Sequence, residues 1–277
     1  MVTFIANYIA TTLPNTMGQN DLQHELQVEN QLAQLSAQVQ AVGGANAIGA
    51  QVSQPVTLGS LGAPPFAAPD GGFIAPLATV SNTTGNYPLS NFTFTLNGQT
   101  HALSSTGSSG FRVLLLNTYA PRAEVAFDQG AVLLAEAGGI PIFIVPPSVT
   151  LSQGVLTVFL PWFLNSVPGE SGKGGADVLL QLVSTTSVTL PSAGQSLASG
   201  SNIVLTFVTP FAVSWYTYFE GVKTLASYAT CVGSNGVCAA NYNSGGQNPL
   251  GTVTLTIPSS VVTTLNAETA VFSVTLA

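Results

Sequence analysis

Alternation of apolar and small polar residues recurs along most of the chain and strongly limits the folds it can adopt. In "FTFTL" (92–96), two phenylalanines and a leucine lie on one side and two threonines on the other. The segments "TVTLTIP" (252–258) and "VFSVTLA" (271–277) alternate in the same way. Side chains of an extended strand point to opposite faces of a sheet in turn, so a period of two predicts half-buried β-strands.

Further strands are expected between these segments, separated by turns rich in Pro and Gly. The candidates are residues 112–117, 131–135, 140–145, 154–160, 178–190, 202–208 and 211–219. Many short strands joined by such turns are typical of antiparallel all-β domains. The sequence therefore predicts a mainly β protein, with one antiparallel β-sandwich or jelly roll over residues 73–277.

Before the strands, residues 20–43 have the pattern of one amphipathic helix. Asn20 is a suitable N-cap, and the glycine pair at 43–44 is a suitable helix stop. Its apolar stripe recurs at spacings of four and three and consists of Val28, Leu32, Leu35, Val39 and Val42. This is the a/d pattern of a coiled coil, so we expect the stripe to be the interface of a homo-oligomer. The alternative is that it packs on the chain's own β domain, because two and a half heptads are short for an independent coiled coil.

The segments on either side of this helix are expected to be extended. Residues 1–19 are interpreted as an N-terminal arm. Residues 44–72 are rich in Gly, Ala and Pro, and we interpret them as a linker to the β domain.

A very low charge content distinguishes this chain from most globular proteins. Only 5% of its residues are charged, against about 25% in typical domains. In strong acid the eleven carboxylates would be protonated and both histidines charged, so the formal charge would change from −7 to about +6. Acid unfolding mostly reflects the loss of carboxylates paired in the native state, and this chain has few. We therefore expect it to tolerate strong acid, and we interpret the helix glutamines as a solubilising surface that does not titrate.

Two classes of partner are disfavoured by the same composition. Four Lys and Arg residues are too few to neutralise a phosphate backbone, so nucleic-acid binding is not expected. The most apolar window, 130–149, contains Glu136, a glycine pair and three prolines. A membrane-spanning helix needs about 20 mostly apolar residues without such breaks, so no membrane span is expected.

Cys231 and Cys238 flank the segment "VGSNGV". If Ser234 and Asn235 form a two-residue turn, the cysteines lie opposite each other on a hairpin, close enough to bond. We expect a disulfide, which would contribute roughly 2.5 kcal/mol through the loop that it closes. The alternative is a pair of reduced thiols in a cellular compartment.

A carbohydrate-binding face is a further candidate. If "FAVSWYTYF" (211–219) is a strand, Tyr216, Tyr218 and Glu220 share the face opposite Trp215. Exposed aromatic rings beside a carboxylate can stack on a sugar and bind its hydroxyl groups, so this face is a possible binding site for a host glycan. The alternative is a cross-strand ladder or a subunit contact.

Catalytic, cofactor and metal motifs are not evident in the sequence. His24 on the helix and His101 in an expected loop have no nucleophile motif beside them, and both are expected at the surface. The segment "PGESGKGG" (168–175) lacks the first glycine of a phosphate-binding loop and the hydroxyl residue after its lysine. We therefore do not expect an enzyme.

Arm, helix, linker and a threonine-rich β body of very low charge together resemble the virion surface proteins of viruses that infect thermoacidophilic archaea. The resemblance is one of composition and layout over the whole chain, and no family residues can be carried over from it. It implies a jelly-roll capsid, turret or fibre subunit, found at the virion surface or in an acidic extracellular setting.

Three functions are compatible with these features. The first is a structural virion component that assembles through its N-terminal segment with its own copies and other virion or surface proteins. The second is a filament or S-layer subunit of an acidophile, for which donor-strand exchange through "MVTFIANYIATTL" would be typical. The third is a secreted, acid-stable glycan-binding protein or glycosidase, for which a buried carboxylate pair in a cleft would be evidence.

Overall fold

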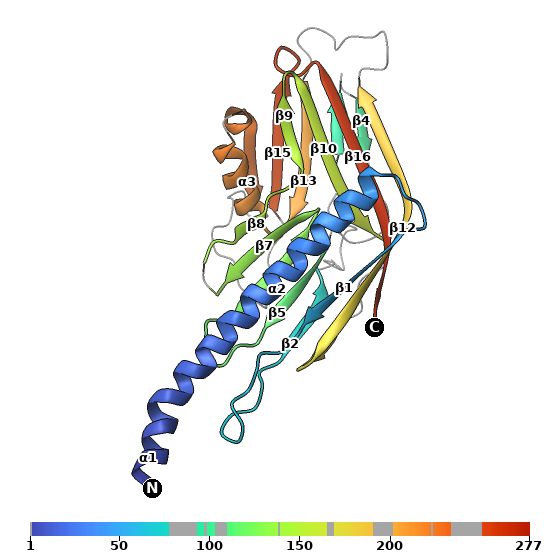
Figure 1. The fold of residues 1–277 in the computed structure, drawn as a ribbon. Helices are drawn as coiled ribbons and strands as arrows, with labels where there is room; N and C mark the ends of the chain where they lie inside the picture. Colours follow the sequence, from blue (N-terminus) through green and yellow to red (C-terminus); the bar gives the residue numbers. More distant parts are fainter. Residues whose placement is uncertain are drawn as a thin grey trace, which may run out of the picture.

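In a computed structural model, the described part of the chain forms a long N-terminal helix and three β-sheets (Figure 1). The prediction of a mainly β fold with an N-terminal helix is confirmed, since strands contain 49% of the described residues and helices 26%. The body contains three sheets, and a two-sheet sandwich or jelly roll is not confirmed. The structure describes residues 2–77, 93–96, 99–102, 110–137, 139–164, 169–190, 202–222, 224–233 and 251–277.

The first sheet contains the longest strands of the protein. Its order is β1 (Gln51–Thr57), β12 (Gly175–Leu190), β16 (Thr264–Leu276), β10 (Val155–Phe163) and β9 (Val149–Ser152). Strands β10 and β16 are parallel, and the other neighbours are antiparallel.

The other two sheets are entirely antiparallel. The second has the order β11 (Glu170–Gly172), β2 (Gly72–Pro76), β5 (Gly110–Leu115), β6 (Ala123–Asp128), β7 (Ala131–Glu136) and β8 (Ile142–Val145). The third has the order β14 (Ala229–Gly233), β15 (Gly251–Pro258), β13 (Asn202–Thr209), β3 (Thr93–Leu96) and β4 (Gln99–Ala102).

Two hydrophobic cores lie on opposite faces of the first sheet. We call the core that also contains residues of the third sheet the first core. Along β10, it contains Leu156, Val158 and Leu160. The second core contains residues of the N-terminal helix and the second sheet. Phe159 and Phe163, on the opposite face of β10, belong to this core. Because neighbouring residues of a strand point to opposite faces, β10 is covered on both sides.

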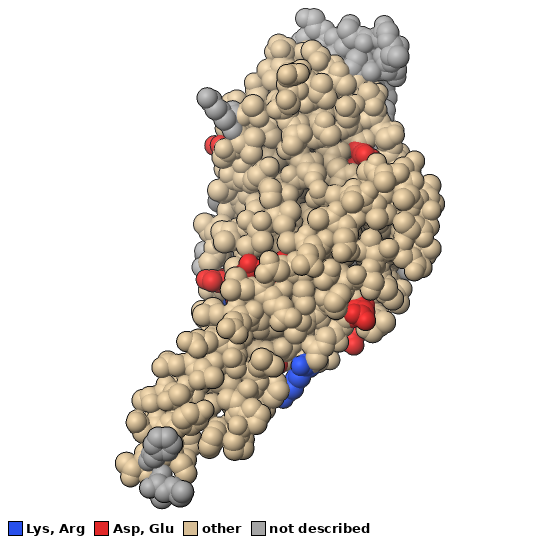
Figure 2. Space-filling model, viewed as in Figure 1, with Lys and Arg blue, Asp and Glu red and all other residues tan. Residues whose placement is uncertain are grey.

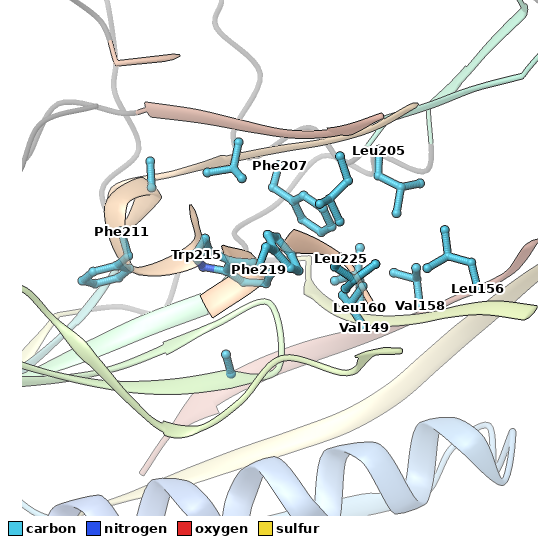
Figure 3. Packing of buried hydrophobic residues seen from close by; sticks show 14 of the residues in the cluster. Val149, Leu156, Val158, Leu160, Leu205, Phe207, Phe211, Trp215, Phe219 and Leu225 are labelled. Atoms are coloured by element: carbon cyan, nitrogen blue, oxygen red, sulfur yellow. The ribbon is translucent and has the colours of Figure 1, made fainter. Parts of the chain in front are cut away.

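Helix α3 (Ala212–Gly221) lies where a strand was predicted at residues 211–219, so that prediction is wrong. Phe211, Trp215 and Phe219 recur every four residues and are all buried in the first core. Figure 3 shows Trp215 and Phe219 beside Phe207 of β13, with ring centroids of Trp215 and Phe207 5.0 Å apart. Tertiary packing of this aromatic stripe outweighs the strand preference of the aromatic side chains.

The N-terminal helix begins at Val2, so residues 2–19 of the predicted arm are helical and continuous with the predicted helix. It consists of α1 (Val2–Asn7), a π-helical segment η1 (Tyr8–Thr12) and α2 (Leu13–Gly44). Pro14 has no N–H to donate and would crowd the preceding turn of a regular α-helix. The wider π-helical turn directly before Pro14 accommodates its ring, so the helix is not broken there. Asn20 is therefore an interior residue of the helix and not its N-cap. The predicted end at the glycine pair is confirmed, because α2 ends at Gly44.

The predicted oligomer stripe of this helix packs inside the same chain. Val28, Leu32, Leu35 and Val39 are fully buried in the second core, and Val42 packs against that core. Helix α2 contacts strands of the first two sheets along this stripe (Figure 1). The assignment of these residues to an interface between copies is therefore corrected in favour of the alternative, packing on the chain's own β domain.

The predicted linker at residues 44–72 contains a strand. In β1, exposed and buried side chains alternate, with Val52 and Val56 pointing into the second core. Pro55 is compatible with this strand because β1 is at the edge of its sheet, where a missing N–H breaks no ladder bond. The β body therefore begins at Gln51 rather than at residue 73.

Close packing of α2 on the first sheet depends on Gly43. A Cβ atom at this position would lie 2.6 Å from the Phe159 ring and 2.9 Å from the Ala270 Cβ. We expect Gly43→Ala to lower the free energy of unfolding by about 1–3 kcal/mol, as overpacked sites do, in a urea titration. Gly44→Ala is the matched control, because nothing lies within 4 Å of its added Cβ. Equal effects of the two substitutions would contradict this packing.

Candidate assembly surface: the helix and hairpin tip

One end of the molecule projects beyond the β body. Residues 2–12 of the N-terminal helix extend past the sheets, and the loop at residues 58–70 between β1 and β2 extends beside them (Figure 1). We refer to these two segments together as the tip. Within the described part of the chain, no helix is both long and apolar enough to cross a membrane.

The two halves of the tip are fixed to each other. The rings of Tyr8 and Phe66 pack with their centroids 5.3 Å apart, and Asn20 Nδ2 donates a hydrogen bond of 2.9 Å to Leu61 O. Within the loop, Ala63 and Ala67 exchange two backbone hydrogen bonds of 3.0 Å. The loop is therefore a small hairpin whose backbone is partly paired internally, and it supports the helix from one side.

The tip exposes several large apolar side chains, and its one charged side chain is that of Asp70, at the base of the hairpin. Ile5, Ile9, Leu61 and Phe66 expose between 42% and 75% of their surface. Residues 2–20 and 58–69 contain no Asp, Glu, Lys or Arg, and in Figure 2 the projecting end carries neither red nor blue atoms. Single exposed apolar residues are ordinary, but several gathered at one end make that end a candidate interaction surface.

A polar junction holds the base of the tip on the body. Asp21 is fully buried and its Oδ2 accepts a hydrogen bond of 3.1 Å from Tyr119 N. On the hairpin side, the carboxylate of Asp70 accepts from the backbone N and the hydroxyl of Thr118 at 2.8 and 2.7 Å. These bonds connect α2 and the hairpin to the same loop between β5 and β6, so the direction of the tip is fixed.

His24 belongs to this junction, which corrects the expectation that it is a surface residue. Its ring is buried, and Nε2–H donates a hydrogen bond of 3.0 Å to Thr57 O. Burial lowers the pKa of His24 below its ordinary value, while the bond to Thr57 and the carboxylates of Asp21 and Asp70 act in the opposite direction. The surroundings of His24 therefore favour its neutral form on balance.

Amide side chains of α2 bind the same strand end without a charge. Gln31 Oε1 accepts from Thr57 N at 2.9 Å, and its Nε2 donates to Thr57 Oγ1 at 3.0 Å. Gln27 Nε2 also donates to Thr57 Oγ1 at 3.0 Å. Some of the glutamines interpreted as a solubilising surface therefore bind the helix to β1, through hydrogen bonds that do not depend on pH.

The predicted carbohydrate-binding face is not formed, because its residues lie on α3. Tyr216 and Glu220 are one helical turn apart, and Tyr218 points to another side of the helix. The ring of Tyr218 packs on Phe143 with centroids 5.4 Å apart, and both tyrosines are partly buried against the first core. A shared face of these three residues would require a strand.

The structure covers the other predicted sites in part. Cys231 lies in β14 and forms a disulfide bond; Cys238, the second cysteine of the sequence, lies outside the described residues. His101 lies in β4 and not in a loop. Within the described ranges, no three His, Cys, Asp or Glu residues are grouped to hold a metal ion.

Comparisons with protein-family models, with curated proteins and with solved structures found no match.

The sequence pattern did not predict the tip. Its clearest signal is the absence of charge over residues 2–20 and again over 58–69, two segments whose proximity is visible only in the fold. The helical arm could have been recognised from Ile5, Ile9 and Leu13, which recur every four residues.

Proposed function

We propose that this protein is a structural subunit of an acid-exposed assembly, such as the capsid, turret or fibre of an archaeal virus. Copies of the chain associate through the tip. The observation that carries this proposal is the projecting end formed by helix residues 2–12 and the hairpin at 58–69, which exposes large apolar side chains and contains no Asp, Glu, Lys or Arg.

Charge favours further copies of this chain as the partner of the tip. The formal charge is −7 at pH 7 and becomes positive in strong acid, so the bodies of two copies repel each other at either extreme. Apart from Asp70 at the base of its hairpin, the tip contains no Asp, Glu, Lys or Arg. Contact between tips therefore brings copies together where repulsion is weakest, and it buries the exposed Ile5, Ile9, Leu61 and Phe66.

The filament alternative has less support from the fold. Donor-strand exchange requires an extended N-terminal segment, whereas residues 2–12 are helical. The low charge of the body and the hydrogen bonds of Gln27 and Gln31 to Thr57 support an acidic setting, because amide hydrogen bonds do not titrate.

The proposal is tested by the solution mass at pH 3, measured by light scattering over a range of concentrations. We expect the wild type to reach a multiple of 28.3 kDa. The double variant Ile5→Gln with Ile9→Gln should fall to the monomer. The matched control is Leu22→Gln with Leu26→Gln, because these leucines are 51% and 56% exposed on the same helix beside the body. The control should keep the wild-type mass.

Two outcomes would contradict association through the tip. One is a wild type that stays monomeric at every concentration, including those expected in a particle. The other is an equal loss of mass in the Leu22 and Leu26 variant, because any exposed leucine of the helix would then serve as well as the tip. Monomeric protein that binds only a different particle component would replace self-association with a heterologous contact.

A further inference from the structure

A second property of the N-terminal helix concerns how its contact with the body responds to pH. The flank of α2 that faces the hairpin of β6 and β7 carries Ser36, whose hydroxyl donates a hydrogen bond of 2.6 Å to Gly130 O in the turn of that hairpin. Glu25 lies three turns earlier on the same flank and is only 8% exposed. A carboxyl group is thus enclosed where the helix passes the other end of the hairpin.

Other carboxylates surround Glu25. Glu29 lies one turn further along α2 and is partly buried, and Glu136 ends β7, where it pairs with Ala123 of β6. Both raise the pKa of Glu25 through their charge. In Figure 2, red carboxylate atoms are visible near the place where α2 crosses β7 in Figure 1.

The remaining charged groups nearby have other partners or are exposed. Arg122 precedes β6; its backbone O accepts from Ala137 N at 3.1 Å, and its side chain is exposed. Asp21 and His24, on the preceding turn of α2, bond to Tyr119 N and Thr57 O. The pKa of Glu25 is shifted upward overall, with burial as the largest cause, to about 7.

The sign of the resulting pH dependence follows from proton binding. The unfolded chain releases this proton near the ordinary value of 4.5, whereas the folded chain keeps it up to about pH 7. The contribution of Glu25 to stability is therefore complete below about pH 4.5 and is lost as pH rises through about 7. Burial also raises the pKa of Glu29, which acts in the same direction.

We propose that Glu25, Glu29 and Glu136 form an acid-dependent latch between α2 and β7. In acid the protonated carboxyl groups of Glu25 and Glu29 allow the N-terminal half of α2 to pack on the body and hold the tip in place. At neutral pH, ionised carboxylates repel across the same contact, and this half of the helix loosens. The C-terminal half keeps its contacts, because the Ser36 hydroxyl and the packing at Gly43 do not titrate.

His24 opposes the latch and must be separated from it. The pKa of His24 is lowered, so its contribution to stability is present above the ordinary value of 6.5 and is lost as pH falls. Hydrogen exchange measured along the helix in several variants distinguishes these groups, since Glu25 and Glu29 loosen the helix as pH rises, whereas His24 does so as pH falls.

The test is amide hydrogen exchange of the full chain between pH 5 and pH 8, corrected for the intrinsic exchange rate. For the wild type, we expect protection of residues 17–30 to fall by about 10- to 100-fold as Glu25 ionises, which corresponds to one to two pK units. Protection of residues 35–43 should stay constant. Glu25→Gln should abolish the fall, and Glu136→Gln should reduce it. Glu220→Gln, at an exposed position of α3, is the matched control and should behave as the wild type.

Two results would overturn the latch. The first is a wild type with constant protection of residues 17–30 over this pH range. The second is a fall in protection that persists unchanged in Glu25→Gln, which would assign it to another group. Neither result depends on association, because the experiment is performed at a concentration at which the protein is monomeric. The latch and the proposed assembly can therefore fail separately.

Discussion

Replacing Trp215 with alanine is expected to lower the free energy of unfolding by about 3–5 kcal/mol, the usual loss for a large buried aromatic side chain. Trp215 is fully buried and stacks on Phe207 at 5.0 Å. Its Nε1–H also donates a hydrogen bond of 3.1 Å to the buried carboxylate of Asp128, which accepts a second one of 2.6 Å from the hydroxyl of Thr209. The substitution removes the packing between α3 and β13 and one hydrogen bond to the buried carboxyl group of Asp128.

Urea denaturation followed by circular dichroism measures this effect. Trp215→Phe keeps most of the ring packing and removes only the hydrogen bond, so we expect a loss of about 1–3 kcal/mol. Thr217→Ala, at an exposed position of the same helix, is the control and should change stability by less than about 0.5 kcal/mol. If Trp215→Ala is no more destabilising than this control, α3 does not close the first core.

Leu32→Ala is expected to lower the free energy of unfolding by about 2–5 kcal/mol, because it leaves a cavity in the second core. Leu32 is fully buried among strands of the first and second sheets. The exposed Leu26 on the same helix is the control, and Leu26→Ala should change stability by less than about 0.5 kcal/mol. The two variants differ in burial and not in chemistry.

The same pair of variants decides between the two interpretations of the helix stripe. If the stripe packs on the body, Leu32→Ala lowers the urea midpoint of the monomer itself. If the stripe were instead a coiled-coil seam, Leu32→Ala would lower the solution mass while the β body kept its wild-type stability. That second outcome would contradict the packing of α2 described here.

Regular alternation made the strands with one exposed face predictable. In β15, Val253, Leu255 and Ile257 are buried in the first core, and the threonines between them are more exposed. Strand β6, in which all six residues are buried, was not among the predicted strands. One face of this strand carries Glu124 and Asp128, which are buried because Glu124 pairs with Arg112 and Asp128 accepts hydrogen bonds from Thr209 and Trp215.

The apolar stripe of α2 illustrates a different limit. Its spacing correctly predicted a buried helical face. A coiled-coil interface and a helix face that packs on a sheet, however, need the same apolar residues. The partner of the stripe depends on where the second core lies in space. For the same reason, the tip and the effect of the Glu136 charge on the pKa of Glu25 were not evident, since each joins segments far apart in the sequence.

We propose that the apolar stripe of α2 packs on the β body, whereas residues 2–12 of the same helix project from it and bind other copies of the chain. Amide hydrogen exchange of the wild type at low and high protein concentration, at a fixed acidic pH, tests it most directly. We predict slow exchange for residues 28–43 at both concentrations, and protection of residues 2–12 and 58–70 only at the high one. Protection gained at residues 28–43, with the tip exchanging equally fast at both concentrations, would contradict the account.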